Sequence, residues 1–405
     1  IDLCVPPDAL RLAPTLLSGM SFRWHPSAAG NIYVGVLSDC IYELREDDAT
    51  VHWRVCGPAD SDRARAQLRE HLSLDRGVTA SAWAGGGQLP VQFFHAAAAL
   101  PGVRVVSVLS RLESLVSFMG SANNNIKRNM QMVASLCANF EENRLGCDSE
   151  GAALFSFPSV AQLCSLSEER LWELGWGYRA PRLHKLSRQL EERGGEAWLD
   201  SLARLCDEEL RAELVALCGV GRKVADCVLL FSYGRDSVVP VDTHCLQMAR
   251  RFLLPPAARD KSFGPALYEQ ISACFVDLFG PLAGWAFMTL FAGELADFRR
   301  RVAAAAAAAE EGGGPGGGGG SPLRPDKRQA RRARLPTQPA PSSPPGKRSR
   351  YFASPPRTYA VPRRPPPAPA PAPRGSAGAA ACRVETRAAR RRRSGCEAEA
   401  QSAEA

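Results

Sequence analysis

A chain of 405 residues, 45% of them hydrophobic, is long enough for two ordinary domains and a tail. The chain is neither short nor rich in cysteine, which disfavours a disulfide framework and favours a reducing compartment. Its 13 cysteines are scattered and form no CxxC pair, which disfavours a zinc site or an iron–sulfur cluster. The net charge of +8 resides in residues 301–405, with 20 Lys+Arg against 7 Asp+Glu, whereas residues 1–300 have 30 against 35. Any DNA affinity of this slightly acidic body must therefore come from a local patch and backbone donors. No apolar run approaches the ~20 residues that span a bilayer, so no membrane contact is expected.

The first hundred residues alternate β-branched and aromatic stretches with Gly, Pro and Asp. This pattern predicts an antiparallel sheet with strands at 21–24, 31–37, 40–44 and 51–55. A helix is expected next, over 61–71. From 101 to 300 the apolar residues recur at helical spacing. We therefore predict an α+β fold, with a β-rich N-terminal domain at 1–100 and an all-α domain at 101–301.

The composition changes near residue 302, where an alanine run leads into a glycine run and then Pro- and Arg-rich sequence. Such a segment cannot bury a core, so residues 302–405 are predicted to be a disordered tail. Its basic clusters fit a nuclear localisation signal or nonspecific nucleic-acid contact, and they equally fit a solvated tail without specific function.

The most informative stretch is a predicted helical hairpin at 207–232 with the turn sequence CGVG. Gly219 and Gly221 permit a tight turn and let the backbone approach a ligand closely. The amides that follow them open the second helix, and such a helix start is a ready site for a DNA phosphate. A purely structural helical hairpin is the alternative.

Lys223 lies in the first turn of that second helix. Partial burial beside Val220 and Val224, together with the positive end of the helix dipole, would favour the neutral amine. A neutral amine can attack a sugar carbon and form a Schiff base. Taken alone, however, Lys223 fits a plain phosphate contact better.

Asp242 follows Val-Pro-Val and precedes a helical stretch, which predicts a helix N-cap. A carboxylate held there stays ionised and could stabilise positive charge that develops on a deoxyribose as a base departs. The alternative is a purely structural cap.

The stretch GVGRKVADC followed by VPVDTH resembles the helix–hairpin–helix glycosylase superfamily, and within it the eukaryotic 8-oxoguanine DNA glycosylases. Further motifs occur in that family's order: SGMSFRW at 18–24, NNNIKR at 123–128, GYRA at 177–180, GPLAGWA at 280–286 and the pair Leu290-Phe291. The resemblance covers most of residues 1–300 and none of the tail.

The resemblance implies a bifunctional glycosylase and AP lyase of base excision repair that removes 8-oxoguanine paired with cytosine. Lys223 would displace the base and form the Schiff base, and β-elimination would then nick the strand. Asp242 would support base departure, and His244 would contact a phosphate. The implied partner is damaged double-stranded DNA, bound by a monomer.

The resemblance also assigns residues to the two bases of the damaged pair. The target base must leave the stack; Phe291 and Cys227 would enclose it, and the carbonyl of Gly19 would accept the hydrogen that only oxidised guanine carries on N7. The opposite cytosine would be held by Asn123, Arg128 and Arg179, while Tyr178 would wedge into the vacated stack. From periodicity alone, Cys227 and Phe291 fit a helix core better, and Gly19 fits a turn.

This sequence departs from the family at two positions. Phe287 stands where the family usually has Gln, whose amide reads the flipped base, so selectivity for the base is in question. Cys218 stands where the hairpin usually has Pro, which predicts a modestly looser turn. No cofactor is expected to be required, and no metal ligands are predicted. The family's hairpin can hold a structural cation, here through the carbonyls of Val215, Leu217 and Val220.

Two alternative functions remain. Phe287 favours a related glycosylase for a different damaged base, and the hairpin alone would fit a non-catalytic DNA-binding module. The chain starts at Ile1, which indicates a fragment or processed chain without its targeting signals. The expected location is the nucleus, with the mitochondrion as a second location.

Overall fold

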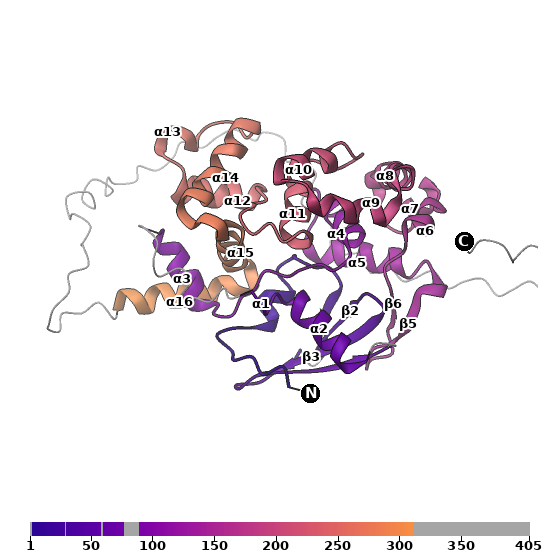
Figure 1. The fold of residues 1–405 in the computed structure, drawn as a ribbon. Coiled ribbons are helices and arrows are strands. Elements are labelled where there is room, and N and C mark those ends of the chain that lie inside the picture. Colours follow the sequence, from indigo (N-terminus) through magenta and orange to yellow (C-terminus); the bar gives the residue numbers. More distant parts are fainter. Residues whose placement is uncertain (1, 29, 58–59, 77–88, 312–405) are drawn as a thin grey trace, which may run out of the picture. The chain divides into compact units, whose positions relative to one another are not determined.

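The computed structural model describes residues 2–28, 30–57, 60–76 and 89–311. Its N-terminal part is a four-stranded antiparallel sheet in the order β1-β2-β3-β4 (Figure 1). The strands are β1 (Trp24–Pro26), β2 (Tyr33–Leu37), β3 (Cys40–Glu46) and β4 (Val51–Cys56). Four predicted strands are therefore confirmed, although β1 starts at the last residue of its predicted range.

Both faces of the sheet are covered, and β2 is buried at all five positions. One face packs with α1 (Leu12–Leu16) and α2 (Ser61–His71) in a core that includes Trp24, Leu44 and Leu68. Gly35 lies opposite Trp24 in the sheet, and a Cβ there would lie 2.3 Å from the indole ring. The tryptophan therefore fills the space that a side chain at residue 35 would need. The predicted bounds of α2 are confirmed.

The other face of the sheet meets a β-hairpin that the expectation of an all-α second domain missed. Its strands are β5 (Arg144–Cys147) and β6 (Ala153–Phe155). Leu145 and Leu154 of this hairpin pack on Val34, Val36 and Ile41 of the sheet. The hairpin therefore supplies the second apolar layer that a fully buried strand needs.

The rest of the described chain is helical, as predicted. In chain order the segments are α3 (Val91–Ala99), α4 (Arg111–Gly120), α5 (Ile126–Cys137), η2 (Glu141–Asn143), α6 (Val160–Cys164), α7 (Glu168–Glu173), η3 (Gly177–Arg179), α8 (Ala180–Arg193), α9 (Gly195–Ser201), η4 (Leu202–Arg204), α10 (Asp207–Val215), α11 (Arg222–Ser232), α12 (Thr243–Met248), η5 (Ala249–Leu253), α13 (Pro256–Arg259), α14 (Pro265–Phe279), η6 (Gly280–Leu282), α15 (Ala283–Glu294) and α16 (Ala296–Glu311). Their apolar faces enclose one large core, in which α11 packs on α4 and α10. All 11 described cysteines are free.

The predicted start of the tail at residue 302 is wrong for residues 302–311, which continue α16. Alanine has the highest helix propensity, so the alanine run extends a helix that has already begun. α16 packs on α3 and α15, with Phe298 buried and Val302 partly buried. Because α3 packs on these late helices, residues 91–99 belong with the helical body and not with the sheet. Residues 312–405 of the predicted tail lie outside the described residues.

One segment, Pro265–Glu294, is long and apolar enough to cross a membrane by length and composition, although no such segment was expected. Half of its most apolar window is buried inside the protein. The segment is also divided at Gly280, whose φ is +56°, into α14 and α15, which pack on each other. Its apolar character is therefore accounted for by the protein core.

His71, the last residue of α2, connects the sheet to the helical body. Its Nε2 accepts a hydrogen bond from Trp24 Nε1 at 2.8 Å, and its Nδ1 donates to the carbonyl of Ser107 at 2.7 Å. This arrangement requires a neutral ring with its proton on Nδ1. Burial lowers the pKa of His71 to about 4, against the opposing effect of the bond to Ser107.

We predict that this histidine makes the fold sensitive to acid. Its pKa is about 4 in the native state, against an ordinary value of 6.5 that applies once the chain unfolds, so its stabilisation is complete above pH 6.5 and is lost as the pH falls toward 4. The expected loss is up to about 1.4 kcal/mol per pH unit in this window. Urea unfolding at pH 7, 6 and 5 measures it, with His71→Gln as the variant that should flatten the dependence. Equal slopes for the two proteins would contradict the assignment.

Candidate active site

The hairpin that carries Lys223 is formed by α10, a short turn and α11, within the predicted range 207–232. Gly219 has a φ of +80°, and a Cβ there would lie 3.1 Å from both Arg182 Cβ and Met119 Sδ. Conformation and space therefore both require glycine at this position. At Gly221, the N-cap of α11, no heavy atom lies within 4 Å of the corresponding point. An anion can therefore approach the first turn of α11 past Gly221, as binding at a helix N-terminus requires.

Cys218 compensates for the proline that the family usually has in this turn. Its backbone N–H donates to Gln189 Oε1 at 2.7 Å, a bond that proline cannot make. The expected loosening of the turn is thus opposed by a tie to α8. The carbonyl of Leu217, one of the predicted cation ligands, accepts the N–H of Val220 at 3.2 Å. Cation binding by this turn stays a prediction.

The amine of Lys223 is half-buried and directed at the end of α4. Nζ donates to Ser121 Oγ at 3.2 Å and lies 5.7 Å from the ring centroid of Phe118. Sequence reasoning missed both partners, because they lie more than 100 residues away and belong to no motif. The contact fixes the amine at a junction of two helices.

Asp242 is the N-cap of α12, as predicted, and its Oδ1 accepts the N–H of Cys245 at 2.9 Å. The buried thiol of Cys227 lies within the electrostatic reach of both catalytic candidates. Burial raises the pKa of this thiol to about 11; the charge of Lys223 lowers it, while that of Asp242 raises it. The structure therefore brings Lys223, Asp242 and Cys227 into one neighbourhood.

The predicted aromatic residues also meet. The rings of Phe287 and Phe291 are 5.7 Å apart on successive turns of α15, and His244 meets Phe291 edge-on at 5.8 Å. Phe291 is half-buried and His244 is exposed. Phe287, however, is only 3% exposed and contacts Phe275 at 5.9 Å, so its ring is part of the core.

The residues predicted for the opposite base gather on the turn after α4. Tyr178 donates through its hydroxyl to the carbonyl of Ala122 at 2.9 Å, and Arg179 donates to the carbonyl of Asn123 at 3.2 Å. Asn123 has a φ of +49°, which turns the chain toward α5. This turn directly follows Ser121, the partner of Lys223. The residues predicted for the opposite base therefore gather directly after the residue that binds the Lys223 amine.

Two arginines of this region, Arg128 and Arg182, lie within electrostatic reach of a third, Arg179. The guanidinium of Arg179 lies 4.3 Å from the ring centroid of Tyr178, and that of Arg182 lies 5.6 Å from it. Burial first, and then the charges of Arg128 and Arg182, lower the pKa of Arg179, while Tyr178 opposes them. Arg179 is only 2% exposed, so its guanidinium supports the turn, whereas Arg128 is exposed. Arg182 was not predicted.

Gly19 lies beside the start of α5. Its φ is +77°, and a Cβ there would lie 3.0 Å from the side chain of Ile126. This places Gly19 next to the Asn123–Arg128 segment. The predicted role of Gly19 in recognising the damaged base stays a prediction.

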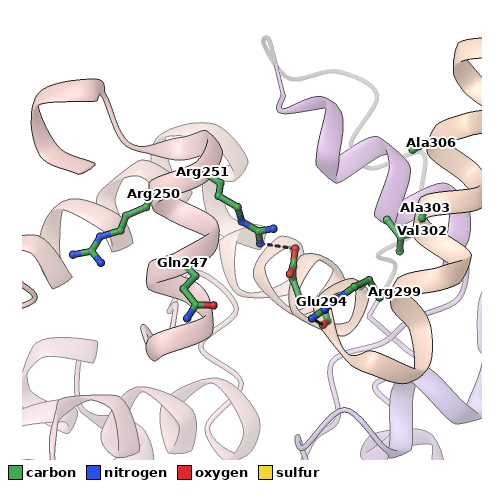
Figure 2. Close-up of a pocket in the computed structure, with 9 residues that line it drawn as sticks. Gln247, Arg250, Arg251, Glu294, Arg299, Val302, Ala303 and Ala306 are labelled. Carbon is green, nitrogen blue, oxygen red and sulfur yellow. Dashed lines mark hydrogen bonds and ion pairs between the residues drawn. The ribbon is translucent and has the colours of Figure 1, made fainter. Parts of the chain in front are cut away.

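A groove of about 630 Å³ lies outside this neighbourhood, between η5 and α16 (Figure 2). It starts at Gln247, one helical turn after His244, and contains the ion pair of Arg251 with Glu294 at 2.6 Å. Arg250 and Arg299 also line it. It contains none of the predicted catalytic residues, so the candidate chemistry is not located in this groove.

Comparisons with known proteins agree with the fold. Residues 3–107 match the 8-oxoguanine DNA glycosylase N-terminal domain, and residues 116–263 match the HhH-GPD superfamily of base excision DNA repair proteins. The N-glycosylase/DNA lyase OGG1 of Arabidopsis thaliana is 35% identical over 294 residues, which are 71% of this chain and 78% of that protein.

Two solved structures are similar over the described body. The 8-oxoguanine glycosylase/lyase of Clostridium acetobutylicum in its apo form has a TM-score of 0.59 and 26% identity, over 70% of this chain and 93% of its own. MBOgg1 in complex with a low-affinity DNA ligand has a TM-score of 0.60 and 25% identity, over 71% and 92%.

The sheet, the helical body and the glycine hairpin define a base excision DNA repair protein of the helix–hairpin–helix class. Within this class, the chain belongs to the 8-oxoguanine DNA glycosylase family, the N-glycosylase/DNA lyases.

We predict that the capping and the charge of Asp242 can be separated by substitution. Asp242→Ala removes the cap and should lower the free energy of unfolding by about 1 kcal/mol. Asp242→Asn keeps an oxygen acceptor for the Cys245 N–H and should stay within about 0.5 kcal/mol of the unsubstituted protein. Urea unfolding at pH 7 checks both variants. A loss for Asn as large as that for Ala would show that the carboxylate charge itself holds α12.

Proposed function

We propose that the chain excises 8-oxoguanine opposite cytosine and then nicks the strand, with Lys223 as the nucleophile. The observation that carries this proposal is the position of the Lys223 amine, half-buried at the start of α11 and close to Asp242 around Cys227. Damaged double-stranded DNA is the proposed partner, and the complex of MBOgg1 with a DNA ligand supports this. For location we propose the nucleus, based on the basic clusters of the tail.

In the proposed reaction the neutral amine of Lys223 attacks the sugar carbon C1′. The C1′–N bond to the base breaks, and the base leaves with its bonding electrons. The carboxylate of Asp242, at the start of α12, stabilises the positive charge that develops on the sugar. Loss of a proton and ring opening then give the Schiff base between Nζ and C1′. Removal of a C2′ proton expels the 3′ phosphate by β-elimination, which nicks the strand.

Ser121 has a defined part in this scheme. Its Oγ accepts a hydrogen bond from Nζ at 3.2 Å and so orients the amine through a neutral partner. The exposed residues Asn123, Arg128 and His244 are available to DNA groups around this point. The exposed side chains of Arg128 and Arg182 provide the positive charge for DNA that the acidic body as a whole lacks.

The nucleophile can be identified by trapping with borohydride, which reduces a Schiff base to a stable protein–DNA adduct. We expect the unsubstituted protein to form this adduct on a damaged duplex, and Lys223→Gln to lower its yield roughly 10³-fold or more, since nothing replaces the amine. Lys261→Gln, an exposed lysine in another loop, is the matched control and should trap normally. An undiminished adduct with Lys223→Gln would assign the chemistry to another amine. If the unsubstituted protein binds the duplex but gives no adduct, the Schiff-base mechanism is wrong, and if it also leaves the damaged base in place the chain is a non-catalytic DNA-binding module.

A second candidate substrate is favoured by Phe287, because a phenyl ring cannot exchange hydrogen bonds with a flipped base. In Phe287→Gln we therefore expect the excision rate of 8-oxoguanine, divided by that of other damaged purines, to rise about tenfold. This factor corresponds to the free energy of roughly one gained hydrogen bond. Single-turnover excision on duplexes with different damaged bases measures this ratio. If 8-oxoguanine opposite cytosine is left intact while another lesion is removed, the second candidate is the substrate.

A further inference from the structure

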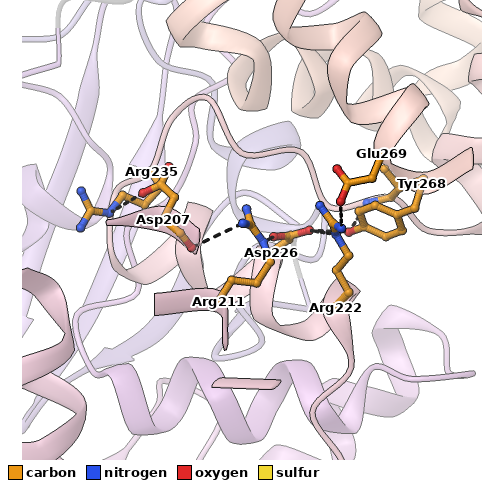
Figure 3. Close-up of polar contacts among 8 residues, drawn as sticks. Asp207, Arg211, Arg222, Asp226, Arg235, Tyr268 and Glu269 are labelled. Atoms are coloured by element: carbon orange, nitrogen blue, oxygen red, sulfur yellow. Dashed lines mark hydrogen bonds and ion pairs between the residues drawn. The ribbon is translucent and has the colours of Figure 1, made fainter. Parts of the chain in front are cut away.

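The helix of Lys223 contains a second buried carboxylate, Asp226, which the proposed chemistry does not use. Asp226 is 1% exposed. Its Oδ1 accepts from Arg211 Nε at 2.6 Å, and its Oδ2 accepts from the hydroxyl of Tyr268, also at 2.6 Å (Figure 3). Arg211 belongs to α10 and Tyr268 to α14. One carboxylate therefore joins both helices of the hairpin to a third helix.

The hydroxyl of Tyr268 makes a second bond, which reaches the segment of Asp242. It accepts the backbone N–H of Val241 at 3.0 Å. Val241 immediately precedes Asp242, and Asp226 follows Lys223 by three residues. Tyr268 is 6% exposed and Val241 is 1% exposed, so water does not compete for these bonds. A single oxygen atom thus connects the helix of the nucleophile to the segment of the carboxylate.

Neighbouring residues contact the ring of Tyr268 itself, so these contacts do not involve its hydroxyl. The guanidinium of Arg222 lies 4.5 Å from the ring centroid and pairs with Glu269, the neighbour of Tyr268. The ring also stacks on Phe263 at 6.3 Å. Removing only the hydroxyl should therefore leave the ring in place. Burial, and then the charge of Asp226, raise the pKa of Tyr268, so the hydroxyl stays a donor through neutral and alkaline pH.

We propose that Tyr268 and Asp226 are positioning residues that set the separation of Lys223 from Asp242. The inference rests on the proposed function, since it concerns the two residues assigned to the chemistry there. Lys223 and Asp242 lie in different segments and bond to different partners, Ser121 and Cys245. The buried bridge from α11 through Tyr268 to Val241 is thus a direct polar tie between their segments. A displacement of about 1 Å between reacting groups can cost about 100-fold in rate.

The test compares two tyrosines of the same chain. Tyr268→Phe removes the bridging hydroxyl and both of its bonds. Tyr233→Phe is the matched control, because Tyr233 caps the other end of α11 and its hydroxyl donates only to the carbonyl of Leu199, at 2.7 Å. The full chain is used, at a temperature well below the unfolding midpoint of each variant. Three quantities are measured: affinity for a duplex with a stable abasic-site analogue, the single-turnover rate of base excision, and the rate of borohydride trapping on an abasic duplex.

We expect Tyr268→Phe to slow excision and trapping by about 10- to 100-fold while the affinity stays within about twofold, since the DNA contacts are elsewhere. Tyr233→Phe should leave all three quantities within about twofold. If both variants behave alike, Tyr268 has only a structural role and the inference is overturned. A loss confined to affinity would also overturn it, because positioning predicts a loss in rate.

A second variant keeps the inference testable if Tyr268→Phe does not fold. Asp226→Asn retains the size of the side chain but loses the charge that holds Arg211 and Tyr268, and it should slow trapping in the same way. An Asp226→Asn protein that is folded and traps normally would overturn the bridge. Failure of the proposed function has a different signature: the unsubstituted protein itself then forms no adduct on either duplex.

Discussion

The burial of α11 is the constraint on which the rest of the site depends. Eight consecutive residues of this helix, 224–231, are buried, so the protein encloses this part of the helix on all sides. α4 and α10 pack on it, and Phe118 of α4 stacks on Phe231 at 5.2 Å. A helix enclosed in this way cannot shift without opening the core. Lys223 belongs to its one accessible turn, so the core determines where the amine lies.

The remaining site residues occupy the ends of elements that touch this helix. The turn Ser121–Asn123 ends α4, the glycine turn precedes α11, and Asp242 starts α12. Each is a place where backbone groups lack helical partners, so polar side chains are needed there in any case. Tyr178, Arg179 and Asp242 meet such needs with hydrogen bonds to or from the backbone. The hydrogen bonds that end or start these helices also hold the predicted site residues in place. The same side chains therefore serve both the stability of the fold and the geometry of the site.

What the sequence predicted correctly was local. The strands, α2, the hairpin and the cap at Asp242 follow from alternation, glycine placement and capping chemistry within a few residues. The bonds of Lys223 to Ser121 and of Tyr268 to Asp226 and Val241 join residues 102, 42 and 27 positions apart, and no local rule encodes them. The β5–β6 hairpin was missed because its short strands gain their stability from the sheet that they cover. The alanine run was misassigned because low complexity was given more weight than its high helix propensity.

Phe287 shows why a departure from the family pattern has to be interpreted in its packing context. The ring is 3% exposed and lies edge-on to Phe275, so an amide in its place would need buried hydrogen-bond partners in a region built from aromatic rings. In the absence of DNA, the phenylalanine ring packs in this position with no hydrogen bond left unmade. The amide of a glutamine would find hydrogen-bond partners only when a flipped base supplies them. Under the proposed function, the substitution thus exchanges a contact made with the base for one made within the protein. Under the proposed function, recognition of the damaged base then rests more heavily on the backbone carbonyl of Gly19. The φ of +77° at Gly19 and the nearby side chain of Ile126 favour glycine at that position, so this recognition element is held by conformation and not by a side chain.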